Sequence, residues 1–143
     1  MKLPQPERGL VIRYSYLWRS EAETGRAEGR KDRPCVIVLA VQRAEGAPTR
    51  VVVVPITHSP PTAPTDAVEL PPRVSQGLGL DHDQSWIVVT EVNVFTWPGP
   101  DLRPAREGSA AFGRLPHGLL EKVRQAILMR NSSRLPMVER DER

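Results

Sequence analysis

Short runs of apolar residues alternate along the chain with polar segments rich in proline and glycine. The runs are rich in β-branched and aromatic residues, which favours a mainly β protein. They predict strands at residues 9–18, 35–41, 50–57, 66–71 and 85–95. The second run, CVIVLAV, is continuously apolar and is typical of a strand buried on both faces. Because segment 42–49 is hairpin-sized and contains glycine and proline, we expect the second and third strands to pair antiparallel.

One segment has the period of an amphipathic helix. Pro116 can occupy the first turn, and the apolar residues that follow then fall on one face: Leu119, Leu120, Val123, Ala126 and Ile127. The last residues, 131–143, are polar and charged, so we expect a flexible tail. The pattern therefore predicts a single domain over residues 1–130, in which a barrel-like sheet is closed by a C-terminal helix over residues 116–130.

Two connections, 19–32 and 97–114, are longer than plain turns. Long loops in compact domains are usually functional or disordered. The first is polar and of mixed charge, with little apolar surface to hold it down, so we expect a mobile lid.

Composition fits an intracellular setting. The 143 residues suit one domain, and the single cysteine, Cys35, excludes an internal disulfide and is best explained as a small buried hydrophobe. No apolar run approaches the ~20 residues of a membrane helix, and the first residues lack the apolar stretch of a signal peptide. We expect a soluble cytoplasmic protein. Its basic ends flank an acidic middle, which permits a polyanionic partner.

Arg33 stands directly before Pro34, at the first step of the most apolar run. Because proline fixes φ, Arg33 is held at a rigid strand entrance, either as a solvated side chain or as an anion-binding group. Thr57 ends the next predicted strand. In an antiparallel pair, the start of one strand lies beside the end of its partner, so the two residues should meet at one end of the sheet.

The order of these features resembles the MazF/PemK (Kid) family, the toxins of type II toxin–antitoxin systems. The resemblance covers roughly residues 9–128 and is carried by EGRKDRPCVIVLA, VVVVPITHS, AVEL, SWIVVTEVNVFTW and LPHGLLEKVRQAIL. It implies an SH3-like β-barrel, usually a homodimer, with an antitoxin as partner. It also implies a metal-independent endoribonuclease (mRNA interferase), without a cofactor. The substrate's 2′-hydroxyl would cleave single-stranded RNA to a 2′,3′-cyclic phosphate and a 5′-hydroxyl.

The resemblance also assigns catalytic residues. Arg33 matches the family's catalytic arginine, Thr57 its threonine, and Glu28 a loop glutamate found in some members. Two further residues could handle the proton: His58 directly follows Thr57 and belongs to the residue type most used for proton transfer, and Glu91 lies in the last predicted strand.

Aromatic and basic residues near the first loop could bind RNA. Tyr14, Tyr16 and Trp18 could stack on unpaired bases, although ordinary strand alternation would bury some of them. Arg30 and Lys31 add positive charge at the far end of the same loop. Asp81–Asp83 contains three possible metal ligands, but such a cluster in a polar turn is more often solvated, and no metal site is predicted.

The late strand departs from the family pattern. Many members have Asp-Gln-x-Arg/Lys where this chain has Thr90-Glu91-Val92-Asn93, so a basic residue is missing. This departure favours an alternative function: a non-enzymatic binding module, or a CcdB-like inhibitor, on the same barrel. The presence of Glu28, Arg33 and Thr57 together favours the nuclease.

Overall fold

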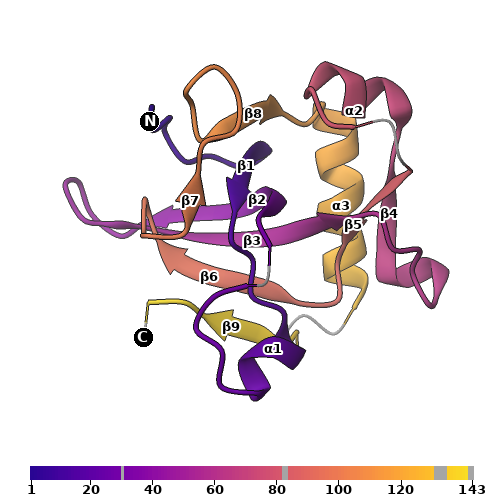
Figure 1. The fold of residues 1–143 in the computed structure, drawn as a ribbon, viewed down its shortest axis with the longest axis horizontal. Coiled ribbons are helices and arrows are strands. Elements are labelled where there is room, and N and C mark those ends of the chain that lie inside the picture. Colours follow the sequence, from indigo (N-terminus) through magenta and orange to yellow (C-terminus); the bar gives the residue numbers. More distant parts are fainter. Residues whose placement is uncertain (30, 82–83, 131–134, 142–143) are drawn as a thin grey trace.

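A computed structural model describes residues 1–29, 31–81, 84–130 and 135–141. Within them the elements follow in this order (Figure 1): β1 (Leu10–Tyr14), α1 (Arg19–Glu23), β2 (Arg33–Gln42), β3 (Thr49–Thr57), the 3₁₀ turn η1 (Pro64–Asp66), β4 (Ala67–Leu70), α2 (Pro72–Gly77), β5 (Ser85–Val88), β6 (Val92–Thr96), β7 (Leu102–Arg103), β8 (Ala111–Arg114), α3 (His117–Met129) and β9 (Met137–Glu139). The predicted mainly β fold with a C-terminal helix is confirmed.

The strands form one strongly bent sheet. Its central path runs β4-β5-β3-β2-β1-β7, while β6 pairs with the first half of β3 and β8 with the first half of β1. The predicted antiparallel pairing of β2 with β3 is confirmed. The named strands pair antiparallel with one exception, since β9 runs parallel to β6.

The predicted closure into a barrel is not observed, because no pairing between described strands joins β4 to β7. β3 exchanges one partner for another at Pro55, since Val53 pairs with β6 and Ile56 pairs with β5. Proline has no N–H to donate to a ladder, so it suits this break. From there β4 and β5 form a separate wing (Figure 1). The predicted single strand 85–95 is accordingly two strands, one on each side of the break.

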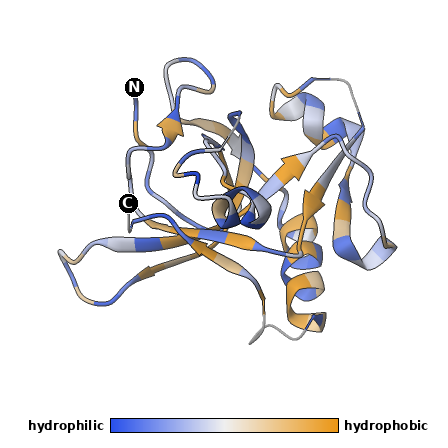
Figure 2. Ribbon diagram, turned by 60° about the horizontal axis from the view of Figure 1, so that its bottom comes forward, coloured by the Kyte–Doolittle hydropathy of each residue, from blue (hydrophilic) through white to orange (hydrophobic). Residues whose placement is uncertain are grey.

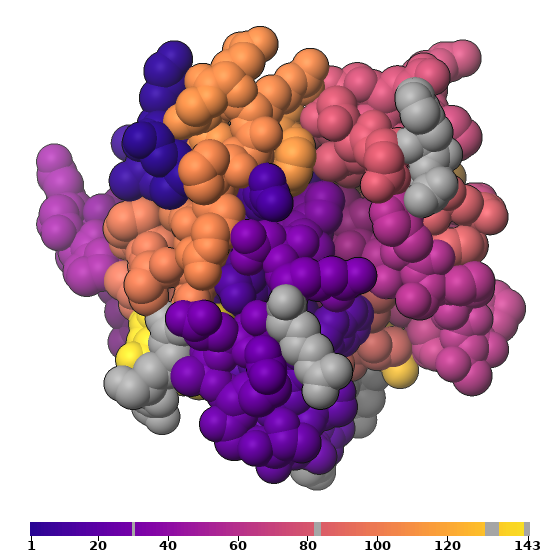
Figure 3. Space-filling model, viewed as in Figure 1, coloured from indigo at the N-terminus to yellow at the C-terminus, as the bar shows by residue number. Residues whose placement is uncertain are grey.

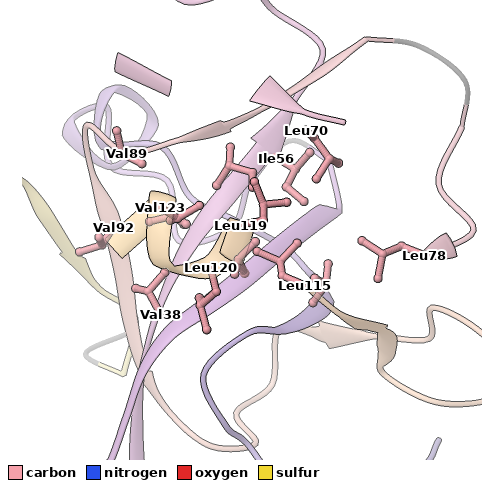
Figure 4. Close-up of a cluster of buried hydrophobic side chains, with 14 of the residues drawn as sticks. Val38, Ile56, Leu70, Leu78, Val89, Val92, Leu115, Leu119, Leu120 and Val123 are labelled. Atoms are coloured by element: carbon pink, nitrogen blue, oxygen red, sulfur yellow. The ribbon is translucent and has the colours of Figure 1, made fainter. Parts of the chain in front are cut away.

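The core lies on both faces of β2 and β3. On one face Val36 and Val38 belong to a cluster that packs under α3 and includes Leu119, Leu120 and Val123 (Figure 4). On the other face Cys35 and Ile37 pack with Tyr14, Tyr16 and Phe95. Burial raises the pKa of the Cys35 thiol, and the prediction that Cys35 is a small buried residue is confirmed. Figure 2 shows the hydrophobic residues concentrated along these strands and α3.

The C-terminal part differs from the prediction at one point. The predicted helix is confirmed at His117–Met129, with Pro116 as its N-cap. The expected flexible tail, however, contains β9 and the buried side chain of Arg140, because polar partners on several other segments hold it in place. No helix of the described residues is long and apolar enough to cross a membrane.

The packing of α3 on the sheet can be tested with two substitutions in that helix. Leu120→Ala should lower the free energy of unfolding by about 2–5 kcal/mol, because it leaves a cavity in the cluster under α3. Leu128→Ala, on the exposed face of the same helix, should change it by less than about 0.5 kcal/mol. Urea denaturation measures both. Similar losses for the two variants would contradict the packing of α3 on the sheet.

Candidate active site

A cleft of about 370 Å³ opens where β2 begins and β3 ends. The β2–β3 ladder ends at the pair of Cys35 with Pro55, and Arg33 and Thr57 each lie two residues beyond it, so both come to this end of the sheet. Both side chains line the cleft. The other lining residues come from the loop before α1, the loop after β3, the start of β4 and the β5–β6 connection: Trp18, Lys31, Ser59, Pro60, Pro61, Thr62, Asp66, Ala67, Val88 and Thr90.

Arg33 rests on an aromatic ring. Its guanidinium carbon lies 5.1 Å from the centroid of the Trp18 ring, a distance at which the ring face attracts a cation. The Nε atom is buried and makes no hydrogen bond with the described residues. No carboxylate in the described part of the chain lies within salt-bridge distance of this guanidinium. Arg33 is therefore supported by Trp18, and no carboxylate among the described residues pairs with its charge, as suits an anion-binding group.

Thr57 supplies a hydroxyl to the same cleft. It is the last residue of β3, opposite Trp86 of β5. Its Oγ1 accepts a hydrogen bond from the backbone N–H of Ser59 at 3.2 Å. This contact orients the side chain and leaves its own proton available to a ligand.

The structure separates the predicted RNA-binding residues. Tyr14 is 0% exposed and stacks on Phe95, and Tyr16 is 1% exposed, so neither ring can stack on a base in this conformation. Both rings lie in the hydrophobic cluster that contains Cys35 and Ile37, because the residues that directly follow β1 are still buried. Trp18 is only partly buried and lines the cleft, and Lys31 is exposed at its rim. Arg30 lies outside the described residues.

Glu91 anchors the first loop and does not line the cleft. Its Oε2 accepts hydrogen bonds from the Tyr16 hydroxyl at 3.1 Å and from the backbone N–H of Arg19 at 2.9 Å. Burial raises the pKa of this carboxyl, although both hydrogen bonds act in the opposite direction. Glu91 thereby ties the start of α1 to the sheet, so the described part of the predicted lid is tethered at this end.

His58 points away from Arg33, because neighbouring side chains on a strand alternate between faces. Its Nε2 lies 3.1 Å from Asp81 Oδ2, and its Nδ1 lies 3.1 Å from Ser85 Oγ and 3.2 Å from the carbonyl oxygen of Gln84. These contacts place His58 against the chain before β5. It is therefore not brought together with Arg33 and Thr57. The other two residues of the Asp81–Asp83 turn lie outside the described part of the chain.

Glu28 is exposed and belongs to the 19–32 loop, whose described residues form the violet surface at the bottom of Figure 3. Its carbonyl oxygen accepts a hydrogen bond from Arg26 Nε at 3.2 Å. Its carboxylate makes no hydrogen bond or ion pair with another described residue. Glu28, like Glu91 and His58, does not line the cleft, so the structure does not bring it together with Arg33 and Thr57. Of the three proton-handling candidates, it is the one whose side chain makes no hydrogen bond or ion pair with another described residue.

Asp66 is a cleft residue that sequence reasoning missed. Asp66 lines the cleft with Arg33 and Thr57. Its carboxylate accepts a hydrogen bond from the backbone N–H of Ala63 at 3.2 Å and pairs with Arg130 at 3.2 Å. The sequence signal was present, since an acid two residues after Pro64 is typical of a short helical turn that begins at the proline.

A sequence model of a protein family matches residues 17–129, and the family is described as a PemK-like, MazF-like toxin of a type II toxin–antitoxin system. The chain belongs to this family of PemK/MazF toxins. The predicted resemblance is thus confirmed, and membership implies an antitoxin partner. The matched range of the PemK/MazF toxin includes Arg33, Thr57 and α3 but not β9. Comparison with curated proteins gave no match.

The raised pKa of Glu91 predicts a pH-dependent stability. The folded toxin holds this proton more tightly than the unfolded chain does, so ionising Glu91 weakens folding. The stability of wild type relative to Glu91→Gln should therefore fall as pH rises from about 4, the ordinary range of glutamate, towards neutrality. Urea unfolding at several pH values measures the difference. The exposed-site control Glu45→Gln should show no such trend, and a difference of opposite slope would contradict the burial of Glu91.

Proposed function

We propose that this toxin is a metal-independent endoribonuclease that cleaves single-stranded RNA in the cytoplasm. The observation that supports it most is one open cleft that contains both the hydroxyl of Thr57 and the guanidinium of Arg33, which pairs with no described carboxylate. A cleft of this kind suits a phosphodiester, because its charge is negative and its oxygens accept hydrogen bonds.

The proposed reaction needs only groups of the protein and of the RNA. The 2′-hydroxyl oxygen attacks the adjacent phosphorus, and its proton passes to a carboxylate base. The bond from phosphorus to the 5′-oxygen breaks, and that oxygen takes up a proton. The products are a 2′,3′-cyclic phosphate and a 5′-hydroxyl. Negative charge grows on the non-bridging oxygens during attack, where the fork of Arg33 and the Thr57 hydroxyl would stabilise it.

Glu28 is the proposed base. Glu91 is engaged with Tyr16 and the start of α1, and His58 faces Asp81. Glu28 carries a carboxylate without a hydrogen bond or ion pair to a described residue. It is on the loop that leads into Arg33 but outside the cleft lining, so the proposal requires this loop to bring it to the bound RNA.

Trp18 and Lys31 are the proposed RNA contacts. An aromatic ring at a cleft favours unpaired bases, since stacking of one base is worth about 1–3 kcal/mol and tolerates any sequence. Lys31 adds an exposed cation for the phosphate backbone. Together they favour single-stranded RNA over a duplex, whose bases are already stacked.

Arg33→Ala should reduce cleavage of a long single-stranded RNA by at least ~100-fold, because charge in the transition state is no longer stabilised. The assay contains EDTA, in which wild type should remain active. Arg33→Lys should restore little, because a lysine has no planar fork. Melting temperature should change little in either variant, since Arg33 has no ion pair among the described residues.

Arg43→Ala is the matched control. Arg43 is an exposed arginine in the β2–β3 hairpin and should be dispensable. Cleavage by Arg33→Ala at the wild-type rate would contradict the nuclease mechanism. That outcome would favour the non-enzymatic binding module, in which the cleft holds an anionic partner without cleaving it.

Glu28→Gln should lower the cleavage rate at neutral pH by about 100-fold or more, because general-base catalysis is lost while the side chain keeps its size. Rates measured at several pH values should also lose the rise on the acidic side that ionisation of the base produces. Glu23→Gln, on α1, is the control from the same loop and should keep both. Should His58→Gln or Glu91→Gln cause the loss instead, the assignment of Glu28 is wrong.

We also propose that the toxin is a homodimer, as the family resemblance implies. Light scattering at micromolar concentration should give about twice the 16.0 kDa of one chain. A monomer mass under these conditions would refute the dimer.

A further inference from the structure

The segment 135–141, here called the C-terminal strap, lies outside the range that the family model matches and is nevertheless built into the fold. Its strand β9 pairs with β6, in register from Val92 with Met137 onward. Figure 1 shows β9 between β6 and α1. Ion pairs with an arginine of β3 also hold this segment in place. Arg50 pairs with both Glu139 and Asp141.

Arg140 turns inward from this strap and is 1% exposed. Its Nη1 donates to the carbonyl oxygen of Ser15 at 2.7 Å and to Asn93 Oδ1 at 2.9 Å. Its Nη2 donates to the carbonyl oxygen of Ala27 at 3.3 Å and lies 3.2 Å from Asp101 Oδ2. One guanidinium therefore joins four segments of the chain.

Two of these segments are the stems of the 19–32 loop. Ser15 lies just before the loop and Ala27 lies near its end. The Asn93 side chain continues the connection, since its Oδ1 accepts from the N–H of Leu17 at 2.9 Å and its Nδ2 donates to the carbonyl oxygen of Leu17 at 2.8 Å. The residue after Leu17 is Trp18.

These contacts lead directly to the candidate site. Trp18 carries the ring beneath Arg33, and Glu28 directly follows Ala27. A shift of either stem would therefore move the support of Arg33 or the proposed base. Displacements of about 1 Å in a catalytic arrangement can cost ~100-fold in rate.

If only packing were needed at this position, an apolar side chain would cost less free energy to bury than a guanidinium does. Burying a charge is unfavourable unless it is paired and hydrogen-bonded, and an apolar residue of similar size often stabilises a fold as well. What arginine adds is a rigid fork with several N–H donors, which can hold separate carbonyl oxygens at fixed positions. The contacts of Arg140 use that property.

We propose that Arg140 is a positioning residue, and that the C-terminal strap sets the arrangement of the 19–32 loop that RNA cleavage requires. The inference rests on the proposed function for its catalytic part. The strap acts through the backbone of Ser15, Leu17 and Ala27, and it touches neither Arg33 nor Thr57 in the contacts described above.

The test is Arg140→Lys in the full chain. Lysine keeps a positive charge beside Asp101, so folding should survive, but it cannot reach all the oxygens that the fork holds. At a temperature where both proteins are fully folded, kcat for single-stranded RNA should fall about 10- to 100-fold. Hydrogen exchange of amides within residues 16–29 should become faster, while exchange in β2 and β3 stays slow.

Leu78→Ala is the control for a loss of stability alone. Leu78 is buried in the core cluster on the α2 side, away from the strap (Figure 4). This variant should lower the melting temperature without changing kcat or loop exchange under the same conditions. An equal loss of kcat in Leu78→Ala would overturn the positioning role, as would wild-type kcat and loop exchange in Arg140→Lys.

Loop exchange also separates this inference from the proposed function. If wild type cleaves no RNA, the nuclease proposal fails, and the exchange rates alone decide whether Arg140 positions the loop. Faster exchange confined to the loop in Arg140→Lys would support that role. Unchanged exchange would overturn it.

Discussion

The pairing of β2 with β3 is the constraint on which both the fold and the candidate site depend. Their side chains enter two hydrophobic clusters, one on each face, so a shift of one residue would exchange the two sets and disrupt both. The same register that satisfies the two clusters brings Arg33 and Thr57 to one cleft. Core packing thus fixes the relative position of the two groups, and the loops around them need only shape the cleft.

The environment of Arg33 differs from that of four other arginines, which contact carboxylates. Arg50, Arg103 and Arg130 each face a carboxylate, and Arg140 is surrounded by oxygens although it is buried. Arg140 also lies over the ring of Tyr14. Arg33, however, has the face of Trp18 without a described carboxylate, and a ring supports a cation without neutralising it. An aromatic support keeps the side chain in place and leaves its charge for a ligand, which a salt bridge would not do.

Much of the central fold could be predicted from sequence because its signals are local. A continuous β-branched run gave β2, the helical period gave α3, and a hairpin-sized connection gave the pairing that joins Arg33 to Thr57. The 85–95 run was misjudged as one strand, because its hydrophobicity does not reveal that β3 changes partner at Pro55.

Other features depend on partners far away in sequence. The burial of Tyr14 and Tyr16 needs a second core that only the folded sheet creates. A glutamate such as Glu91 can act in catalysis, but here its carboxylate anchors the first loop because the start of α1 lies beside it. Arg140 stands in a polar stretch typical of a tail, and its oxygen partners on Ser15 and Ala27 are 125 and 113 residues away. No local pattern carries such information.

The long separation between Arg140 and the segments it holds has a consequence for synthesis. Ribosomes make the chain from its N-terminus, so Ser15, Leu17 and Ala27 are synthesised early. The Arg140 guanidinium that holds these segments is synthesised only after every helix and strand described here. A chain interrupted before residue 140 would still contain Arg33, Thr57 and the whole β2–β3 pair. It would lack the group that ties the loop stems together, so translation would deliver the components of the site well before the contact that fastens them.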